Sequence, residues 1–271
     1  MKISTYIIDA FTDEAFKGNP AGVCLAESQL PDKTMQAIAG ELNLSETAFL
    51  LQNEQDKNVF SIRYFTPTVE IPFCGHATLA SAKLVLDVLK NDQVEFVTGH
   101  ALHLFAWPET GGRIKMKFPL YETVDYQTDN SLYHALGISF PVNTRFAKAL
   151  DMLLIEVENK QLLESLTPDY PQLLASTDTV KEVVVTAKSD DDEYDFYSRC
   201  FCPWIGINED PVTGAAHSVL AKYWGNLLDK KEMKAYQVSK RGGYLQLKIT
   251  SDTELEVISQ AHVVLEGTMH V

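Results

Sequence analysis

The sequence predicts an α+β fold built from two strand-rich halves. Each half contains many short β-type segments and one mostly apolar helix that follows a glycine, at 76–89 in the first half and at 214–228 in the second. A helix that is apolar on most of its circumference is typical of a buried helix. The two helix starts also share a pattern, HATLA from His76 and HSVLA from His217. A curved sheet wrapped around one buried helix in each half fits these features better than a doubly wound sheet.

The pattern of the first half predicts strands and two helices. Pro31 suits the first turn of a helix at 31–42, in which the apolar side chains fall on one face. Residues 17–23 contain two glycines and a proline and are expected to form a loop. Strands are expected at 2–11, 47–51, 59–65, 93–97, 101–107 and 113–118.

The second half repeats this organisation. Helices are expected at 131–136, 159–165, 169–175 and 214–228, and strands at 142–148, 152–157, 180–187, 195–201, 236–239, 244–250, 254–258 and 261–271. The segment 119–128 is polar and irregular, which marks a candidate hinge. We therefore expect an N-terminal lobe at 1–118, a C-terminal lobe at 129–260, and a last strand at 261–271 that could pack on either lobe.

Composition narrows the class of protein. The chain has 271 residues, 45% of them hydrophobic and 22% charged, which is typical of a soluble globular protein. A net charge of -14 without clusters of Lys and Arg argues against nucleic acid or an anionic membrane as partner. The N-terminus lacks a signal-peptide pattern, no segment is long and apolar enough to span a bilayer, and the four irregularly spaced cysteines do not suggest a disulfide framework. We expect a cytoplasmic protein.

Glu46 is the first candidate for chemistry. It follows a helix break and comes directly before an apolar strand. Desolvation beside apolar residues raises the pKa of a carboxyl group, which suits a general acid/base. A surface glutamate at a strand start is the plain alternative.

His76 and Asp210 are the second pair of candidates. Each lies near the start of a predicted buried helix, where open N–H groups and the helix dipole favour an anionic group. The pattern predicts a binding site between the N-termini of the two helices. The alternatives are that Asp210 caps its helix and that His76 fills space.

Other chemistry is weakly supported. Cys74 could be an activated thiol near a helix start, but the second stretch offers no matching cysteine, and a buried inert thiol is the favoured reading. No metal site is expected, because His100 and His103 lack partners at ligand spacing and the two cysteines at 200 and 202 lack a second pair. No phosphate loop or dinucleotide fingerprint is present, so no cofactor is expected. The turn SKRGG, at 239–243, could contact an anion through Arg241 and its glycines.

These segments together resemble the phenazine-biosynthesis PhzF-like family of isomerases, which is related to diaminopimelate epimerase. The resemblance covers essentially the whole chain and rests on five segments in a fixed order. They are GNPAGV at 18–23, SETAF at 45–49, FTP at 65–67 running on to GHAT at 75–78, EDPVTG at 209–214, and S-x-RGG at 239–243.

The resemblance implies a diaminopimelate-epimerase-like fold, with two pseudo-symmetric lobes that are each a β-barrel around a central helix. It implies a cofactor-free proton shift on a small cyclic or amino-acid-like carboxylate, carried by Glu46 and assisted by His76 and Asp210. The expected substrate-binding residues are Asn19, Gly75, Thr213, Gly214, Ala215, Arg241 and Gly242. Ala215 stands where the family usually has serine, so a hydroxyl that could bond the substrate is missing.

The sequence leaves two other functions open. An amino-acid racemase or epimerase on the same fold would need acid/base groups on both faces of a carbon. A small-molecule binding protein that has lost turnover would keep the cleft without the reaction. Exposed sheet edges of a strand-rich fold could pair two copies into a homodimer.

Overall fold

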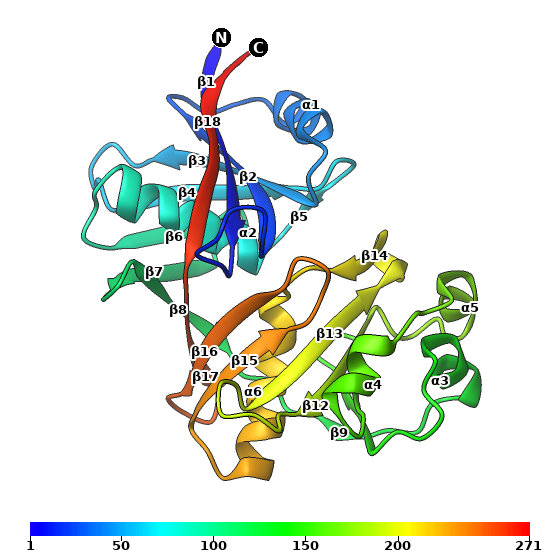
Figure 1. Ribbon diagram of the computed structural model, residues 1–271. Coiled ribbons are helices and arrows are strands. Elements are labelled where there is room, and N and C mark those ends of the chain that lie inside the picture. The colour runs from blue at the N-terminus through cyan, green and yellow to red at the C-terminus, as the bar shows by residue number, and fades with distance from the viewer. The chain divides into compact units, whose positions relative to one another are not determined.

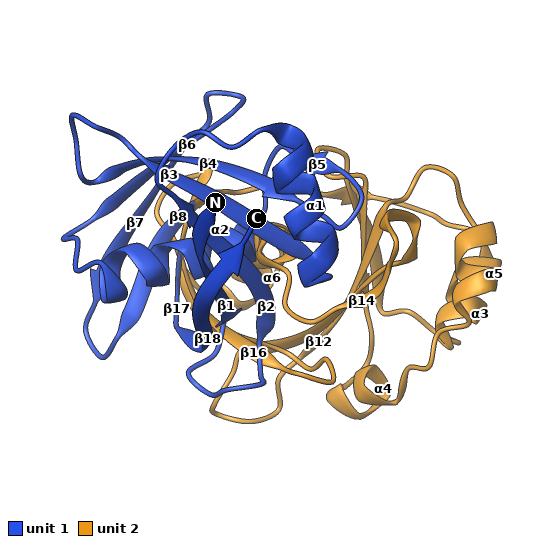
Figure 2. Cartoon of the chain, turned by 90° about the horizontal axis from the view of Figure 1, so that it is seen from above, with its two compact units in different colours: residues 1–117, 257–271 blue, residues 118–256 orange.

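The computed structural model describes all residues, 1–271, and divides the chain into two compact units. Unit 1 comprises Met1–Lys117 and Val257–Val271, and unit 2 comprises Phe118–Glu256 (Figure 2). The bounds of the units differ from those of the predicted lobes. Phe118 and the candidate hinge at 119–128 belong to unit 2, and residues 257–260 belong to unit 1. Within unit 2, the backbone N–H of Leu120 in this segment donates to the Thr253 carbonyl at 2.9 Å. None of the helices is long and apolar enough to cross a membrane.

Unit 1 is a curved sheet around one buried helix. Its elements are β1 (Lys2–Ala10), β2 (Asn19–Ala26), α1 (Asp32–Leu42), β3 (Glu46–Gln52), β4 (Val59–Phe65), β5 (Glu70–Ile71), α2 (Gly75–Lys83), the π-helix η1 (Leu84–Val88), β6 (Val94–Thr98), β7 (His103–Glu109), β8 (Arg113–Pro119) and β18 (Ala261–His270). β18 lies antiparallel beside β1, so both termini lie at one end of the unit (Figure 1). The sheet continues from β1 through β2, β3, β4, β6 and β7 to β8.

The helix α2 occupies the inside of this sheet. It contacts β1, β2, β3 and β18, and seven successive residues from His76 to Ala82 are buried. Burial on every side explains why the helix is apolar around its circumference. The predicted single helix at 76–89 is instead an α-helix that changes to a π-helix after Lys83.

Unit 2 is a sheet with helices on both faces. Its elements are β9 (Val124–Asp125), α3 (Asn130–Leu136), β10 (Asn143–Ala147), β11 (Met152–Glu156), α4 (Lys160–Ser165), α5 (Tyr170–Ala175), β12 (Glu182–Lys188), β13 (Phe196–Cys202), the 3₁₀ turn η2 (Pro203–Ile205), β14 (Ile207–Asp210), α6 (Gly214–Leu228), β15 (Glu232–Gln237) and β16 (Gly243–Ile249). Two strands cross between the units: β8 ends with two residues of unit 2, and β17 (Glu254–Ser259) runs from unit 2 into unit 1.

Alternation along β12 assigns the two faces of this sheet. Val183 and Val185 belong to the apolar core that includes residues of α3, α4 and α5. Thr186 follows Val185 and points to the opposite face of the sheet, where it accepts a hydrogen bond from the indole of Trp224 in α6 at 2.9 Å. The long apolar helix α6, which begins and ends where the sequence predicts, therefore covers one face, and the three short helices cover the other.

One local prediction was wrong, and one short strand was missed. The expected loop at 17–23 lies mostly in β2, where a side chain at Gly22 would come within 2.8 Å of the Thr47 hydroxyl. Gly22 is therefore needed for close strand packing and does not mark a turn. The strand β14, which ends at Asp210, was not predicted, because four residues give too short a pattern to recognise.

Candidate active site

Glu46, His76 and Cys74 form a compact cluster in unit 1. Glu46 is the first residue of β3, His76 is the second residue of α2, and Cys74 precedes that helix in an extended conformation. The Oε2 atom of Glu46 lies 3.2 Å from Nε2 of His76. The Sγ atom of Cys74 lies 3.4 Å from the other ring nitrogen, Nδ1. The structure thus brings together a carboxylate, an imidazole and a thiol from two separate segments.

The carboxyl group of Glu46 is largely removed from water. Its side chain is 12% exposed, and burial raises its pKa, while a hydrogen bond from Ser45 lowers it in part. The buried Oε2 atom faces His76 at contact distance but has no aligned hydrogen bond. Such a carboxyl group can hold a proton closer to neutral pH and exchange it with a bound molecule.

Neighbouring strands position this cluster. β2 and β3 pair in parallel, with Ala21 opposite Glu46, so Asn19 at the start of β2 lies two residues before that pair. The Ser45 hydroxyl lies 3.5 Å from His76 Nε2. Asn19 is fully buried. Ser45 was not predicted as a site residue, and its place next to Glu46 was the only available signal.

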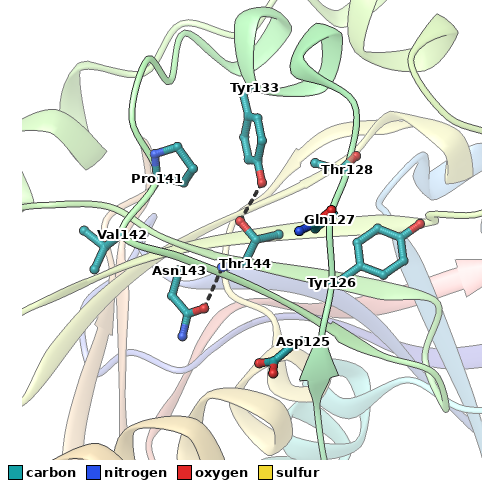
Figure 3. A pocket seen from close by; sticks show the side chains of 9 residues that line it. All are labelled: Asp125, Tyr126, Gln127, Thr128, Tyr133, Pro141, Val142, Asn143 and Thr144. Carbon is teal, nitrogen blue, oxygen red and sulfur yellow. Dashed lines mark hydrogen bonds between the residues drawn. The ribbon is translucent and has the colours of Figure 1, made fainter.

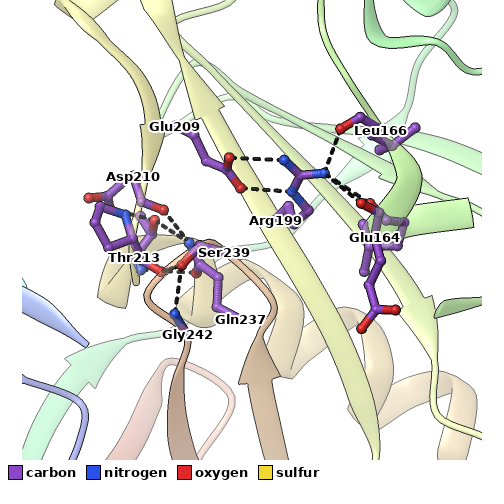
Figure 4. Close-up of polar contacts among 11 residues, drawn as sticks. Glu164, Leu166, Arg199, Glu209, Asp210, Thr213, Gln237, Ser239 and Gly242 are labelled. Carbon is purple, nitrogen blue, oxygen red and sulfur yellow. Dashed lines mark hydrogen bonds and ion pairs between the residues drawn. The ribbon is translucent and has the colours of Figure 1, made fainter. Parts of the chain in front are cut away.

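A second polar cluster lies in unit 2 around Asp210 (Figure 4). The hydroxyl of Thr213 donates to Asp210 Oδ2 at 2.5 Å. The buried amide of Gln237 donates to the Asp210 carbonyl at 2.7 Å and accepts from the Thr213 backbone N–H at 3.0 Å. Asp210 is thus hydrogen-bonded to Thr213, the residue before α6. That helix begins at Gly214 without a side-chain cap.

The glycine turn is tied to this cluster. The Ser239 hydroxyl donates to the Pro211 carbonyl at 2.6 Å and accepts from the Gly242 backbone N–H at 3.0 Å (Figure 4). Gly242 has a φ of +68°, and a side chain there would come within 2.1 Å of the Tyr236 hydroxyl. The structure therefore gathers the predicted residues of unit 2, which are Asp210, Thr213, Gly214, Ala215, Arg241 and Gly242, around two adjoining turns.

Gln237 and Arg199 support this cluster and were missed. Arg199 of β13 binds the Glu209 carboxylate through two nitrogens at 2.7 and 2.9 Å, and it donates to the Leu166 carbonyl at 2.8 Å (Figure 4). Glu209 directly precedes Asp210, so the ion pair holds β14 in place. No local pattern marks either residue, because their partners are distant in the chain.

The two helix starts are less alike than the sequence suggests. α2 begins at Gly75 and α6 at Gly214, so Ala215 holds the position in α6 that His76 holds in α2. His217 lies two residues deeper, is fully buried, and donates from Nδ1 to the Thr213 carbonyl at 2.7 Å. Burial lowers the pKa of His217 to about 4, so the ring is neutral. Its role is structural, whereas His76 faces a carboxylate.

Two pockets lie away from these clusters. One of 690 Å³ in unit 2 is lined by residues 125–128, 141–144 and Tyr133, and its side chains are mainly polar (Figure 3). A smaller one of 300 Å³ in unit 1 lies among α1, β3 and β4. Neither contains a predicted site residue. Asp125, the charged residue of the larger pocket, is paired with Arg145.

Comparisons with known proteins agree on one family. The family model described as phenazine biosynthesis-like protein matches residues 8–268. A human phenazine biosynthesis-like domain-containing protein is 40% identical over 288 residues, covering 99% of each chain. A protein named uncharacterized isomerase from Halalkalibacterium halodurans is 42% identical over 275 residues, again covering 99% of each.

Solved structures give the same result and extend it to the fold. A phenazine biosynthesis protein of the PhzF family from Enterococcus faecalis has a TM-score of 0.91 and 34% identity, covering 100% of both chains. A hydroxyproline epimerase from Agrobacterium vitis has a TM-score of 0.55 at 9% identity, covering 98% of this chain and 92% of that one. This second likeness concerns the fold alone and confirms the predicted α+β, epimerase-like architecture. The chain belongs to the phenazine biosynthesis-like protein family, which includes proteins named isomerases.

Proposed function

We propose that this protein is a cofactor-independent isomerase in which Glu46 moves a proton between two carbons of a small cyclic or amino-acid-like carboxylate. The observation that carries the proposal is the buried carboxyl group of Glu46, whose pKa is raised by burial. A group that must both take and return a proton works best when its pKa lies near the working pH. Family membership and the relatives named isomerases support the same class of reaction.

His76 has an assisting role in this proposal. Its Nε2 atom lies 3.2 Å from the Glu46 carboxylate and 3.5 Å from the Ser45 hydroxyl. A ring at that distance can stabilise the carboxylate after the proton has left it, or hydrogen-bond a substrate oxygen on which charge develops. The prediction that Asp210, Arg241 and the start of α6 contact the same substrate stays a prediction.

Replacing the carboxyl group tests the proposal. For a carboxylate that the wild-type protein isomerises, we expect the rate in Glu46→Gln to be about 10²–10⁴-fold lower, which is the usual contribution of a positioned acid/base. Glu41→Gln is the matched control, because Glu41 is exposed on α1 of the same unit and should leave the rate unchanged. A panel of dihydro-aromatic and amino acids, followed by NMR for a double-bond shift or an inverted centre, supplies the assay. Full activity in Glu46→Gln would contradict the proposal.

A racemase is the second candidate, because one observation favours it. The Cys74 thiol contacts the His76 ring at 3.4 Å, and such contact can favour a thiolate that acts as a base. A stereo-inverting reaction also needs a second acid/base on the opposite face of the carbon. The equivalent position before α6 is Thr213, which cannot serve as that base near neutral pH. The single-carboxylate reaction is therefore the better-supported candidate.

A further inference from the structure

We propose that Glu46, Cys74 and His76 bind one thiophilic divalent cation of the Zn²⁺ type, and that the bound cation inhibits the protein. The binding stands on the geometry of these three side chains alone. The inhibition rests on the proposed function, because a cation held there would occupy the carboxylate that carries the proton. The three donor groups lie within 4.8 Å of one another.

The donor atoms lie close enough together to form a small tetrahedral site after one side-chain rotation. Ligand atoms at usual Zn–N, Zn–O and Zn–S lengths lie about 3.3 to 3.6 Å apart in a tetrahedron. Nε2 of His76 lies 3.2 Å from Glu46 Oε2 and 4.0 Å from Cys74 Sγ. Sγ now lies closer to the other ring nitrogen, Nδ1, at 3.4 Å, so a cation on Nε2 requires a rotation of the Cys74 side chain that brings Sγ to the Nε2 edge of the ring.

The chemistry of the donors selects the kind of cation. A thiolate, an imidazole and a carboxylate suit zinc or cobalt, whereas magnesium and calcium prefer oxygen ligands only. Oε2 of Glu46 is buried without a hydrogen bond and so has lone pairs to give. Three protein ligands leave a fourth position open to water. Binding displaces the thiol proton of Cys74, and any proton on Glu46, into solvent, and no other bond changes.

Cobalt serves as the spectroscopic probe. Co²⁺ bound by a thiolate gives a sulfur-to-metal charge-transfer band in the near ultraviolet, so titration of the full chain reports Cys74 directly. The matched control is Cys24→Ala, because Cys24 is a buried thiol of the same unit that hydrogen-bonds with Thr5 outside the cluster. Titration calorimetry with Zn²⁺ alone gives stoichiometry and affinity, and the thermal midpoint with and without Zn²⁺ shows that each variant is folded.

We expect one cobalt ion per chain, a charge-transfer band in the wild type and in Cys24→Ala, and no band in Cys74→Ser. Zinc affinity should fall by at least about tenfold in Cys74→Ser and in Glu46→Gln. Absence of the band in the wild type, or its persistence in Cys74→Ser, overturns the metal site. These readouts need no substrate, so they can refute the metal site without testing the proposed isomerase reaction. In the same way, a failed isomerase assay does not refute metal binding. If isomerisation is found and saturating zinc leaves its rate unchanged, the inhibitory part is wrong.

Discussion

Lowering the pH should destabilise unit 2 through His217. This ring belongs to α6 and is fully buried, stacks on Phe196 at a centroid distance of 6.2 Å, and donates from Nδ1 to the Thr213 carbonyl. Its other nitrogen, Nε2, is buried without a hydrogen-bond partner. Protonation would therefore place a charge and an unsatisfied N–H group inside the core, which is costly.

The size of the effect follows from the pKa values. Burial lowers the pKa of His217 from 6.5 to about 4. At about 1.36 kcal/mol per pKa unit, the difference corresponds to about 3.4 kcal/mol between the two protonation states. Because the folded pKa lies below the unfolded one, this stability is fully present above pH 6.5 and is lost as the pH falls toward 4. Between about pH 7.5 and pH 5 the linkage relation gives a loss of about 2 kcal/mol.

Urea unfolding of the wild type and of His217→Asn at these two pH values measures the effect. The asparagine amide can still donate to the Thr213 carbonyl but does not titrate, so the difference in pH dependence between the two proteins isolates His217. The fluorescence of Trp224, which stacks on Phe196, reports unfolding of this core. Burial raises the pKa of Glu46, which acts in the opposite direction and is common to both proteins. Equal pH dependence in the two proteins would refute the reasoning.

Two further predictions concern the support of the Asp210 cluster. Arg199→Ala should lower the free energy of unfolding by about 2–3 kcal/mol, because the Arg199 side chain is only 11% exposed and its loss leaves the Glu209 carboxylate and the Leu166 carbonyl without their donor. Arg63→Ala, whose ion pairs lie at the surface of unit 1, should cost less than about 1 kcal/mol in the same urea assay, and equal losses would contradict the argument. Gly242→Ala should cost about 2 kcal/mol or more, because the new side chain meets Tyr236 in addition to adopting a left-handed backbone. Gly111→Ala shares the positive φ but faces open space, so a loss as large as that of Gly242→Ala would show that contact with Tyr236 is unimportant.

Strong periodic patterns made much of the fold predictable. The clean alternation at 113–118 became β8, and the apolar run at 214–228 became α6 with the same bounds. Both segments are long enough for one face, or the whole circumference, to be read from the residues alone. By contrast, Gly22 looked like a turn residue, and only its packing against Thr47 shows that it belongs to a strand. A contact of this kind cannot be read from a single segment.

The candidate site was predictable where the chemistry lies in the segment itself. Glu46, His76 and Asp210 were named as candidates because each stands beside a helix or strand boundary, and their partners within each unit became visible only in the structure. The side chain of Gln237 hydrogen-bonds to the Asp210 carbonyl, 27 residues away in the chain, and no local signal marks it. Cys74 was set aside as an activated thiol for lack of a matching cysteine in the second half, and its contact with His76 became visible only in the structure.

The central claim is that one buried carboxyl group carries the proton from one carbon to another. The most direct test follows a substrate deuterated at the donor carbon through a single turnover in ordinary water. Because the Glu46 side chain is 12% exposed, we expect slow exchange with solvent while the substrate is bound, and we predict that part of the deuterium reaches the acceptor carbon of the product. Complete loss of deuterium to water, together with turnover that persists in Glu46→Gln, would contradict the account.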